Sequence, residues 1–406
     1  MRGLPTIVLC ALCALLAGCG PLTTTELRAD DIEASRHAWS DLSSEVDRLA
    51  APLVESGHTP GLLVGVRLPD GGMRFFGYGV ADERTGRPPD RDTLFAIGSL
   101  SKGYLGAVTA LLVSEGRLSW SDTLRDLLPL ETPLSRDAAQ ITVLQLATHT
   151  SGLPRQPLSL RTLRYFVEYL FDGENFYRHF TSDYLLNYLA DFEADNPGRP
   201  QYSNIGYGLL SYVIERRTGQ SAERLIEQKI ISPLRLRCTG FVPGDLPCRG
   251  NRARGYAGDQ PKFIARGSPV PDWSFTPVME GTAGMYSNAR DLLAFAAAHL
   301  QGHKTPLNAV LASDTVVRVP QPERAAAVSW IVDDVAGQPI TYQIGIVGGY
   351  TSYLGMDTGN NTAVVVLQNS FNWDSSLGHK LLLSLRYGRR PTAAEQVPAE
   401  NRTSGG

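Results

Sequence analysis

Ser99 and Lys102 stand three residues apart at the start of an apolar segment. Residues three apart share one face of a helix, and the apolar residues at 105, 108, 111 and 112 predict that a helix follows. Gly98 permits a sharp turn into that helix, so Ser99 is expected at a helix N-terminus, where free N–H groups favour developing negative charge. A lysine buried beside it would lose hydration and become able to accept the serine proton. The pair therefore predicts a serine nucleophile with a lysine base.

The same spacing also arises when a serine and a lysine merely share the exposed face of a helix, where they would carry no chemistry. Two observations favour the nucleophile. Only five of the 38 basic residues are lysines, and Lys102 is the one that follows a serine at this spacing. Apolar neighbours are also an unusual setting for a lysine without a function.

The first nineteen residues are expected to be a lipoprotein signal peptide. Arg2 supplies the positive charge at its start, and the apolar run from 7 to 16 is too short to span a bilayer. The run ends in Leu16-Ala17-Gly18-Cys19, which resembles a bacterial lipobox. This resemblance implies that Cys19 carries lipid. It places the mature protein in the periplasm, anchored to the outer membrane because Gly20 rather than an aspartate follows. The alternative is an ordinary signal peptide with incidental cysteines.

Two cysteines lie beyond the signal peptide, and they flank a loop rich in proline and glycine. A disulfide between Cys238 and Cys248 is expected in an oxidising compartment. Two unpaired thiols are the alternative, because the sequence does not fix the distance between them. His299 and His303 are four residues apart near a predicted helix end, but without a third ligand they predict no metal site. No metal or other cofactor is expected.

Length and charge exclude further classes of protein. A chain of 406 residues with 43% hydrophobic residues suits one or two domains with a large core. The net charge of −3 gives no electrostatic footprint for nucleic acid, and no glycine loop of the P-loop type is visible. A nucleic-acid partner is therefore not expected.

The order of the predicted elements indicates an α+β fold. A helix is expected over about 31–55, and strand patterns occur at 61–68, 73–80, 328–335, 340–345, 350–356 and 362–368, followed by a helix over about 375–385. These elements predict an antiparallel sheet flanked by helices, built from both chain ends (31–104 and 301–390), with a mainly helical insert (105–300). Residues 20–30 are expected to form a tether, and residues 391–406 a disordered tail.

A tyrosine and an asparagine two residues apart would give the Ser–Lys pair a phenol for proton transfer and an amide for substrate binding. The sequence holds this pattern twice, as Tyr202-Ser203-Asn204 and as Tyr286-Ser287-Asn288. The first follows a Pro/Gly loop at 197–200 and precedes a predicted helix. Taken alone, each pattern favours a buried tyrosine and a helix cap.

With these motifs, the segment from about 61 to 385 resembles the class C serine β-lactamases and the low-molecular-weight penicillin-binding proteins of the AmpH carboxypeptidase/endopeptidase type. The resemblance implies a β-lactamase/transpeptidase-like fold. It also implies a periplasmic penicillin-recognising serine hydrolase that forms a Ser99 acyl-enzyme on β-lactams or D-Ala-ended peptidoglycan peptides. It assigns Tyr202 to catalysis and Asn204 to substrate binding, whereas Tyr286 matches a non-catalytic segment. The matching segments are IGSLSK at 97–102, ITVLQLATHTSGLP at 141–154, YSN at 202–204, SPL at 232–234, residues 281–293 and GGYTSYL at 348–354.

The third motif of that family, Lys-Thr-Gly or His-x-Gly, differs here. Its spacing from Gly348-Gly349 places it on Gln343-Ile344-Gly345, so a neutral glutamine stands where the family has a cation. In the family this cation helps to hold the substrate carboxylate. Its replacement removes electrostatic help toward β-lactams and D-Ala peptides.

The resemblance implies further site residues. The N–H groups of Ser99 and Ile346 would form an oxyanion hole, with Gly345 beside them. Gln156 matches a family glutamine that contacts the substrate amide, although an ordinary loop glutamine fits the spacing equally well. His149 lies in a recurrent turn of the family and is interpreted as structural.

Two other functions stay open. An esterase on the same fold would fit the missing cation, and a receptor would be acylated by β-lactams without turning them over. The sequence leaves the substrate, the deacylation rate and the oligomeric state undetermined.

Overall fold

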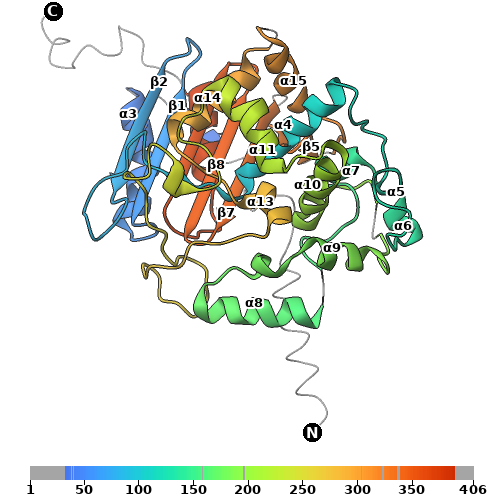
Figure 1. Ribbon diagram of the computed structural model, residues 1–406. Helices are drawn as coiled ribbons and strands as arrows, with labels where there is room; N and C mark the ends of the chain where they lie inside the picture. The colour runs from blue at the N-terminus through green and yellow to red at the C-terminus, as the bar shows by residue number, and fades with distance from the viewer. Residues whose placement is uncertain are drawn as a thin grey trace, which may run out of the picture.

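The computed structural model describes residues 33–388, apart from 38, 40, 158, 195–196, 303, 322–323 and 336–338. The predictions for the signal peptide with Cys19, for the tether, for His303 and for the tail after residue 390 lie outside the described residues. Within them, a central sheet has helices on both of its faces (Figure 1).

Seven of the described strands form one large antiparallel sheet in the order β2-β1-β9-β8-β7-β6-β5. Strand β1 pairs with β9, so that Leu62 lies opposite Gln368. The two ends of the chain therefore build one sheet, which confirms the predicted α+β class. The strands are β1 (Gly61–Arg67), β2 (Met73–Gly79), β5 (Ala325–Ala326), β6 (Ile331–Asp334), β7 (Pro339–Val347), β8 (Tyr350–Asp357) and β9 (Thr362–Gln368).

Alternate residues of the strands enter two separate cores. Leu63 faces a core that includes α14 (Ala289–Leu300), whereas its neighbour Leu62 faces the core formed with α3 (Leu42–Glu55) and α16 (Ser376–Tyr387). Successive side chains of a strand point to opposite faces, so a strand covered on both sides must be apolar throughout. This explains the nearly unbroken apolar sequences of β1 and β9.

Helices from the middle of the chain gather on the side of the sheet away from α3, where Figure 1 shows them in colours from cyan through green and yellow to orange. Helix α4 (Ser101–Ser114) packs against several of them and is apolar on nearly all sides, as expected for an enclosed helix. The others are α5 (Leu124–Leu127), α6 (Arg136–Ala139), α7 (Val143–Ala147), α8 (Leu160–Asp172), α9 (Ser182–Leu189), α10 (Asn204–Thr218), α11 (Ala222–Ile226), α12 (Ser232–Leu234), α13 (Pro277–Ala283) and α15 (Pro306–Asp314).

The helix predicted over about 31–55 begins later, at Leu42. Asp41 has an extended backbone, and its side chain accepts a hydrogen bond from the Ser44 N–H at 3.0 Å. Such a cap satisfies an N–H group that the first turn leaves without a partner, and it ends the helix on that side. No helix among the described residues is long and apolar enough to cross a membrane.

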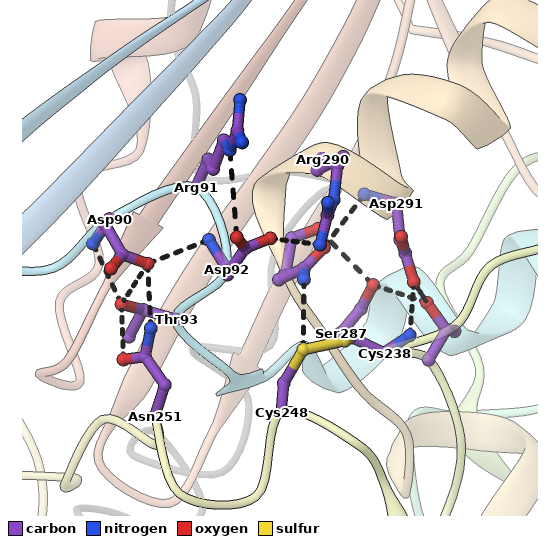
Figure 2. Close-up of a disulfide and its surroundings, with 12 residues drawn as sticks. Asp90, Arg91, Asp92, Thr93, Cys238, Cys248, Asn251, Ser287, Arg290 and Asp291 are labelled. Carbon is purple, nitrogen blue, oxygen red and sulfur yellow. Dashed lines mark hydrogen bonds and ion pairs between the residues drawn. A yellow bond between two sulfur atoms is a disulfide. The ribbon is translucent and has the colours of Figure 1, made fainter.

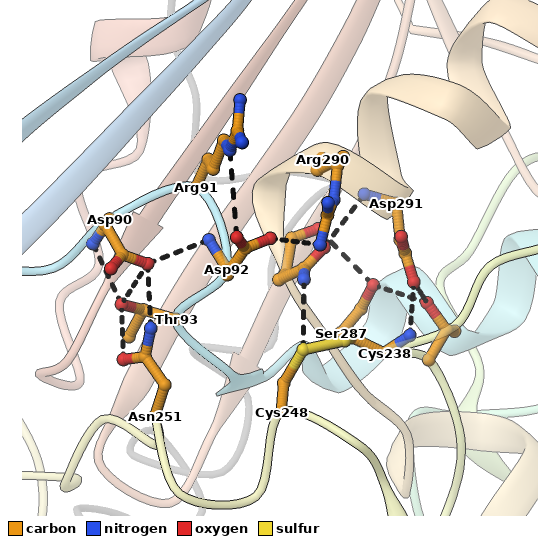
Figure 3. Close-up of polar contacts among 12 residues, drawn as sticks. Asp90, Arg91, Asp92, Thr93, Cys238, Cys248, Asn251, Ser287, Arg290 and Asp291 are labelled. Atoms are coloured by element: carbon orange, nitrogen blue, oxygen red, sulfur yellow. Dashed lines mark hydrogen bonds and ion pairs between the residues drawn. A yellow bond between two sulfur atoms is a disulfide. The ribbon is translucent and has the colours of Figure 1, made fainter.

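A disulfide joins Cys238 to Cys248 beside the N-terminus of α14, with their Cα atoms 5.7 Å apart (Figure 2). The Cys238 N–H donates to the Asp291 carboxylate at 2.7 Å, and the Thr239 hydroxyl lies 3.1 Å from the same oxygen. On the other side of the α14 N-terminus, Arg290 pairs with Asp92 (Figure 3). The disulfide loop and the segment before residue 95 are thus fixed to one helix end.

A short ribbon connects this region to the segment that precedes Ser99. Strand β3 (Phe95–Ala96) pairs with β4 (Tyr286–Ser287), so that Ala96 lies opposite Tyr286. Gly240, inside the disulfide loop, exchanges two backbone hydrogen bonds with Tyr286, at 2.8 and 3.0 Å. The loop, β4 and β3 therefore form a continuous hydrogen-bonded unit that ends at Ile97.

Candidate active site

Ser99 lies in a single 3-10 turn, Gly98–Leu100, between β3 and α4. Gly98 adopts a left-handed φ of 51°, which a side chain would disfavour. The Ser101 hydroxyl donates to the Gly98 carbonyl at 2.6 Å and accepts from the Met285 N–H at 3.2 Å. These contacts fix the turn, so Ser99 is held at the entrance of the helix while its side chain stays partly exposed.

Lys102 lies in the first turn of α4 and is completely buried. Its amine donates to Ser99 Oγ at 2.9 Å and to the Thr282 carbonyl of α13 at 3.0 Å. Burial holds the pKa of Lys102 well below its usual range, and the positive charge of Arg155 lowers it further. A neutral amine within hydrogen-bond reach of a serine hydroxyl can accept its proton.

Tyr202 is the tyrosine that meets Ser99. Burial raises the pKa of its phenol, while Arg155 and a hydrogen bond with the Ser99 side chain oppose this effect, which leaves the pKa at about 12. The centroid of the Tyr202 ring lies 5.0 Å from Lys102 Nζ. Tyr286, in contrast, belongs to β4 and its hydroxyl receives a hydrogen bond from Arg252 at 3.2 Å.

His149 supports the Tyr202 ring from a strained turn. Its backbone has a φ of 57°, and its ring stacks on Tyr202 with centroids 4.4 Å apart. The Ser203 N–H donates to His149 Nδ1 at 3.1 Å. Burial is the main cause that holds the pKa of His149 well below its usual range, and the charge of Arg155 adds to it. A neutral imidazole that accepts a backbone N–H and carries the ring of Tyr202 acts as a positioning group.

Three side chains form a polar row beside Tyr202. The Asn204 amide donates to the Tyr177 hydroxyl at 2.6 Å, and that hydroxyl lies 3.4 Å from Gln156 Oε1. Asn204 and Gln156 are both largely buried, and Asn204 Oδ1 accepts no hydrogen bond from the described residues. Sequence reasoning missed Tyr177, because no motif marks a tyrosine that meets Asn204 from 27 positions away.

Strand β7 approaches the Ser99 turn from the other side. A Cβ placed on Gly98 would lie 3.0 Å from the Ile346 nitrogen, and one on Gly345 would lie 2.0 Å from the Ile97 carbonyl oxygen. The Ser352 hydroxyl of β8 also donates to the Ile97 carbonyl, at 2.8 Å. The strand edge and the turn therefore touch backbone to backbone, which only glycine permits at these positions.

Gln343 lies on β7 two residues before Gly345 and is 1% exposed. Its amide donates to the Ser329 carbonyl at 2.9 Å, and its Oε1 accepts the Ile344 N–H at 3.0 Å. Residues two apart in a strand direct their N–H groups to the same edge of that strand. The Ile346 N–H therefore points to the same edge as the Ile344 N–H, which is already bonded to Gln343 Oε1. The structure thus places Gln343 beside the site with its amide engaged on protein groups.

Arg155 is a second residue of the site that the sequence did not single out. Its guanidinium carbon lies 4.4 Å from the centroid of the Tyr202 ring. Cation–aromatic contact between positions 47 apart depends on the tertiary fold and has no signature in the sequence.

No group of three or more potential metal-ligating side chains occurs in the described part of the chain. His299 is buried in α14, where its Nδ1 lies 2.9 Å from the Phe295 carbonyl oxygen.

Comparison with known proteins assigns the chain to a family. A family model described as beta-lactamase matches residues 46–386. A beta-lactamase of Yersinia enterocolitica is 27% identical over 263 residues, which cover 64% of this chain and 60% of that protein. Esterase EstB of Burkholderia gladioli is 31% identical over 235 residues, which cover 53% of this chain and 59% of that protein. The chain therefore matches less than two thirds of the length of either relative.

Among solved structures, a class C beta lactamase from Rhodobacter sphaeroides superposes with a TM-score of 0.69 and 23% identity. The superposition covers 84% of this chain and 98% of the other. It supports the assignment of the fold.

Proposed function

The chain belongs to the beta-lactamase family, and we propose that it is a serine hydrolase that forms an acyl-enzyme on Ser99. The observation that carries this proposal is the Lys102 amine, fully buried and 2.9 Å from Ser99 Oγ. Burial, with the charge of Arg155, lowers its pKa and so favours the neutral amine that can act as a base, and a hydrogen bond to the Thr282 carbonyl holds the amine near the hydroxyl.

In the proposed acylation, Ser99 Oγ attacks a substrate carbonyl carbon while Lys102 Nζ takes the hydroxyl proton. The N–H groups of Ser99 and Ile346 donate to the oxyanion that forms. Collapse of the tetrahedral intermediate breaks the bond to the leaving group. Tyr202 passes the proton from Lys102 to that group. Water then attacks the acyl-enzyme carbonyl and gives a proton to the same base. The second tetrahedral intermediate breaks its bond to Ser99 Oγ, which takes that proton back from Lys102, and the acid leaves with Ser99 and Lys102 restored.

For the substrate, we propose β-lactams or D-Ala-ended cell-wall peptides. Asn204 Oδ1 is buried and accepts no hydrogen bond from the described residues, so a substrate amide N–H would satisfy it. Gln156 and Tyr177 hold the Asn204 amide in the orientation that this contact needs.

An ester substrate is the second candidate, and Gln343 favours it. The position of the family's cation holds a neutral amide that is already bonded to Ser329 and Ile344. A substrate without a carboxylate on that side would lose nothing from the replacement. Receptor activity, with acylation but no turnover, is the third outcome that an experiment must distinguish.

We also propose that the protein acts in the periplasm, anchored to the outer membrane through a lipid on Cys19. The lipobox-like Leu16 to Cys19 segment supports this. A Cys19→Ser protein should lose lipid labelling and move to the soluble fraction. Recovery of the wild-type protein entirely in the soluble periplasmic fraction would reject the lipid anchor.

Intact mass measured during incubation with a penicillin, a carbapenem and a chromogenic ester tests the function. A transient adduct with product supports a lactamase, a persistent adduct supports a receptor or slow peptidase, and turnover of the ester alone supports an esterase. Ser99→Ala should abolish every adduct, and Lys102→Ala should be nearly as severe because the two residues act as a unit. Unchanged turnover by Ser99→Ala protein would reject the mechanism.

A further inference from the structure

Arg155 brings to the catalytic centre a positive charge that none of the motifs supplies. Its guanidinium carbon lies 4.4 Å from the centroid of the Tyr202 ring. Burial is the larger cause of the low pKa of Lys102, and the charge of Arg155 adds to it. An effect on the Lys102 amine means that the electrostatic field of Arg155 reaches the reacting atoms.

The Arg155 guanidinium has no acidic partner among the residues that the structure describes. Within the part of the chain that the structure describes, its side chain makes no hydrogen bond and no ion pair, and its contact is with the Tyr202 ring. Arg178, in contrast, pairs with Glu174 at 2.8 Å, and Arg386 pairs with Asp357 at 2.6 Å. A partly exposed guanidinium retains N–H donors that fit a carboxylate in solution.

The backbone fixes Arg155 beside the polar row of Asn204, Tyr177 and Gln156. The Asn204 N–H donates to the Arg155 carbonyl at 3.1 Å, and the Ser203 hydroxyl donates to the Pro154 carbonyl at 2.8 Å. Gln156 is the next residue in the chain. The unpaired charge therefore stands beside Asn204, which is proposed to accept an amide N–H of the substrate; in a penicillin that amide belongs to the acyl side chain.

The β7 edge offers no such charge, because Gln343 is neutral and its amide is bonded to protein groups. We propose that Arg155 binds an anionic group on the acyl portion of the substrate. This proposal rests on the hydrolase function above. The preferred substrates would carry a carboxylate on the acyl group and a leaving group without charge.

Matched substrates test this preference, because each pair differs in one charge. Carbenicillin is benzylpenicillin with a carboxylate added to its acyl side chain. The 4-nitrophenyl monoester of adipic acid carries a terminal carboxylate that the corresponding adipamate ester replaces by a neutral amide. A third pair, the butyrate esters of 4-nitrophenol and of 3-carboxy-4-nitrophenol, places the carboxylate on the leaving group.

We expect wild-type kcat/KM to favour the adipate over the adipamate ester by about tenfold to a hundredfold at low salt, the range for a charge-assisted hydrogen bond. Arg155→Gln should bring this ratio close to one, and Arg155→Lys should keep part of it, since an ammonium supplies charge without the planar fork. The matched control is Arg161→Gln. Arg161 is exposed and lies over the Tyr184 ring at 5.9 Å, so its removal should leave the ratio unchanged.

An adipate-to-adipamate ratio that stays the same in the Arg155→Gln protein would overturn the proposal. The proposal would also be overturned if Arg155→Gln lowered the preference for the carboxylate on the leaving group, in the butyrate pair, as much as it lowered the adipate preference. The charge of Arg155 would then act on a carboxylate at either position. If the wild-type protein neither hydrolyses nor is acylated, the proposed function fails instead. The charge preference is then measured as equilibrium binding of the two adipic esters to Ser99→Ala protein, with and without Arg155→Gln. Equal affinities in the presence of Arg155 would reject it.

Discussion

Replacing Gly345 by alanine should damage the proposed site without unfolding the protein. A Cβ at this position would lie 2.0 Å from the Ile97 carbonyl oxygen and 2.3 Å from Ser352 Oγ. The serine hydroxyl can rotate away. The Ile97 carbonyl cannot, because it belongs to the backbone that leads directly into Ser99. The methyl group must therefore push β7 and the Ser99 turn apart.

The size of this displacement follows from the contact distance. Cβ atoms do not approach other heavy atoms closer than 3.0 Å, so a contact of 2.0 Å requires a shift of about 1 Å. Misplacement by about 1 Å can lower an enzymatic rate about a hundredfold. Overpacking of this kind also lowers the free energy of unfolding by about 1–3 kcal/mol. Gly345→Ala should therefore reduce the acylation rate about a hundredfold in a protein that still folds.

Acylation of Ser99 by a labelled penicillin or ester, together with urea unfolding, measures both effects. Gly244→Ala is the matched control, because a Cβ there meets nothing within 4 Å. Adding Ser352→Ala to Gly345→Ala should not restore the rate, since the Ile97 contact remains. Acylation at the wild-type rate in Gly345→Ala protein would refute the reasoning, and rescue by Ser352→Ala would place the strain at Ser352 instead of Ile97.

Other substitutions test separate parts of the structure. Tyr202→Phe should lower kcat/KM far more than Tyr286→Phe, because the first phenol contacts Ser99 and the second contacts Arg252; equal losses would contradict this assignment. Burial lowers the pKa of His299 from 6.5 to about 4 in the folded protein, so the unfolded chain binds the proton first as the pH falls. The free energy of unfolding should therefore decrease by about 3 kcal/mol between about pH 6.5 and about pH 4, and a His299→Leu protein with the same slope would refute this. Replacing both Cys238 and Cys248 by alanine should cost about 2–3 kcal/mol in urea unfolding, as expected for so short a loop, and reductant should then have no further effect.

The sequence predicts those parts of the fold and site that depend on local pattern. Strands β1 and β9 are apolar runs bounded by turn residues, and their positions follow from that pattern. Ser99 and Lys102 are close because one helical turn joins them, so three-residue spacing is enough to predict their contact. Tyr202 could be chosen over Tyr286 only because a family resemblance distinguished two identical patterns.

The remaining site residues depend on contacts between distant segments. Tyr177 reaches Asn204, and Arg155 reaches Tyr202, because separate loops pack together. The hydrogen bonds of Gln343 could not be predicted from the sequence either, since the carbonyl that it contacts belongs to Ser329 on the loop before β6. The third motif lacks its positive charge at Gln343, and Arg155 supplies one from a different loop. This relation can be recognised only from the three-dimensional arrangement of the loops.

The pairing of the chain's two ends has a consequence for how the protein comes to be made. The Gly61 N–H donates to the Asn369 side chain at 2.7 Å, across 308 positions. Contacts of such long range slow folding, because most of the chain must be ordered before they can form. Until residues 362–368 emerge during synthesis, the outer edge of β1 is unpaired as well as that of β2, and other unfinished chains can pair with it. Ser99 is synthesised early, yet the sheet edge that abuts it is completed only near the end of the chain, so newly made protein should acquire activity late and all at once.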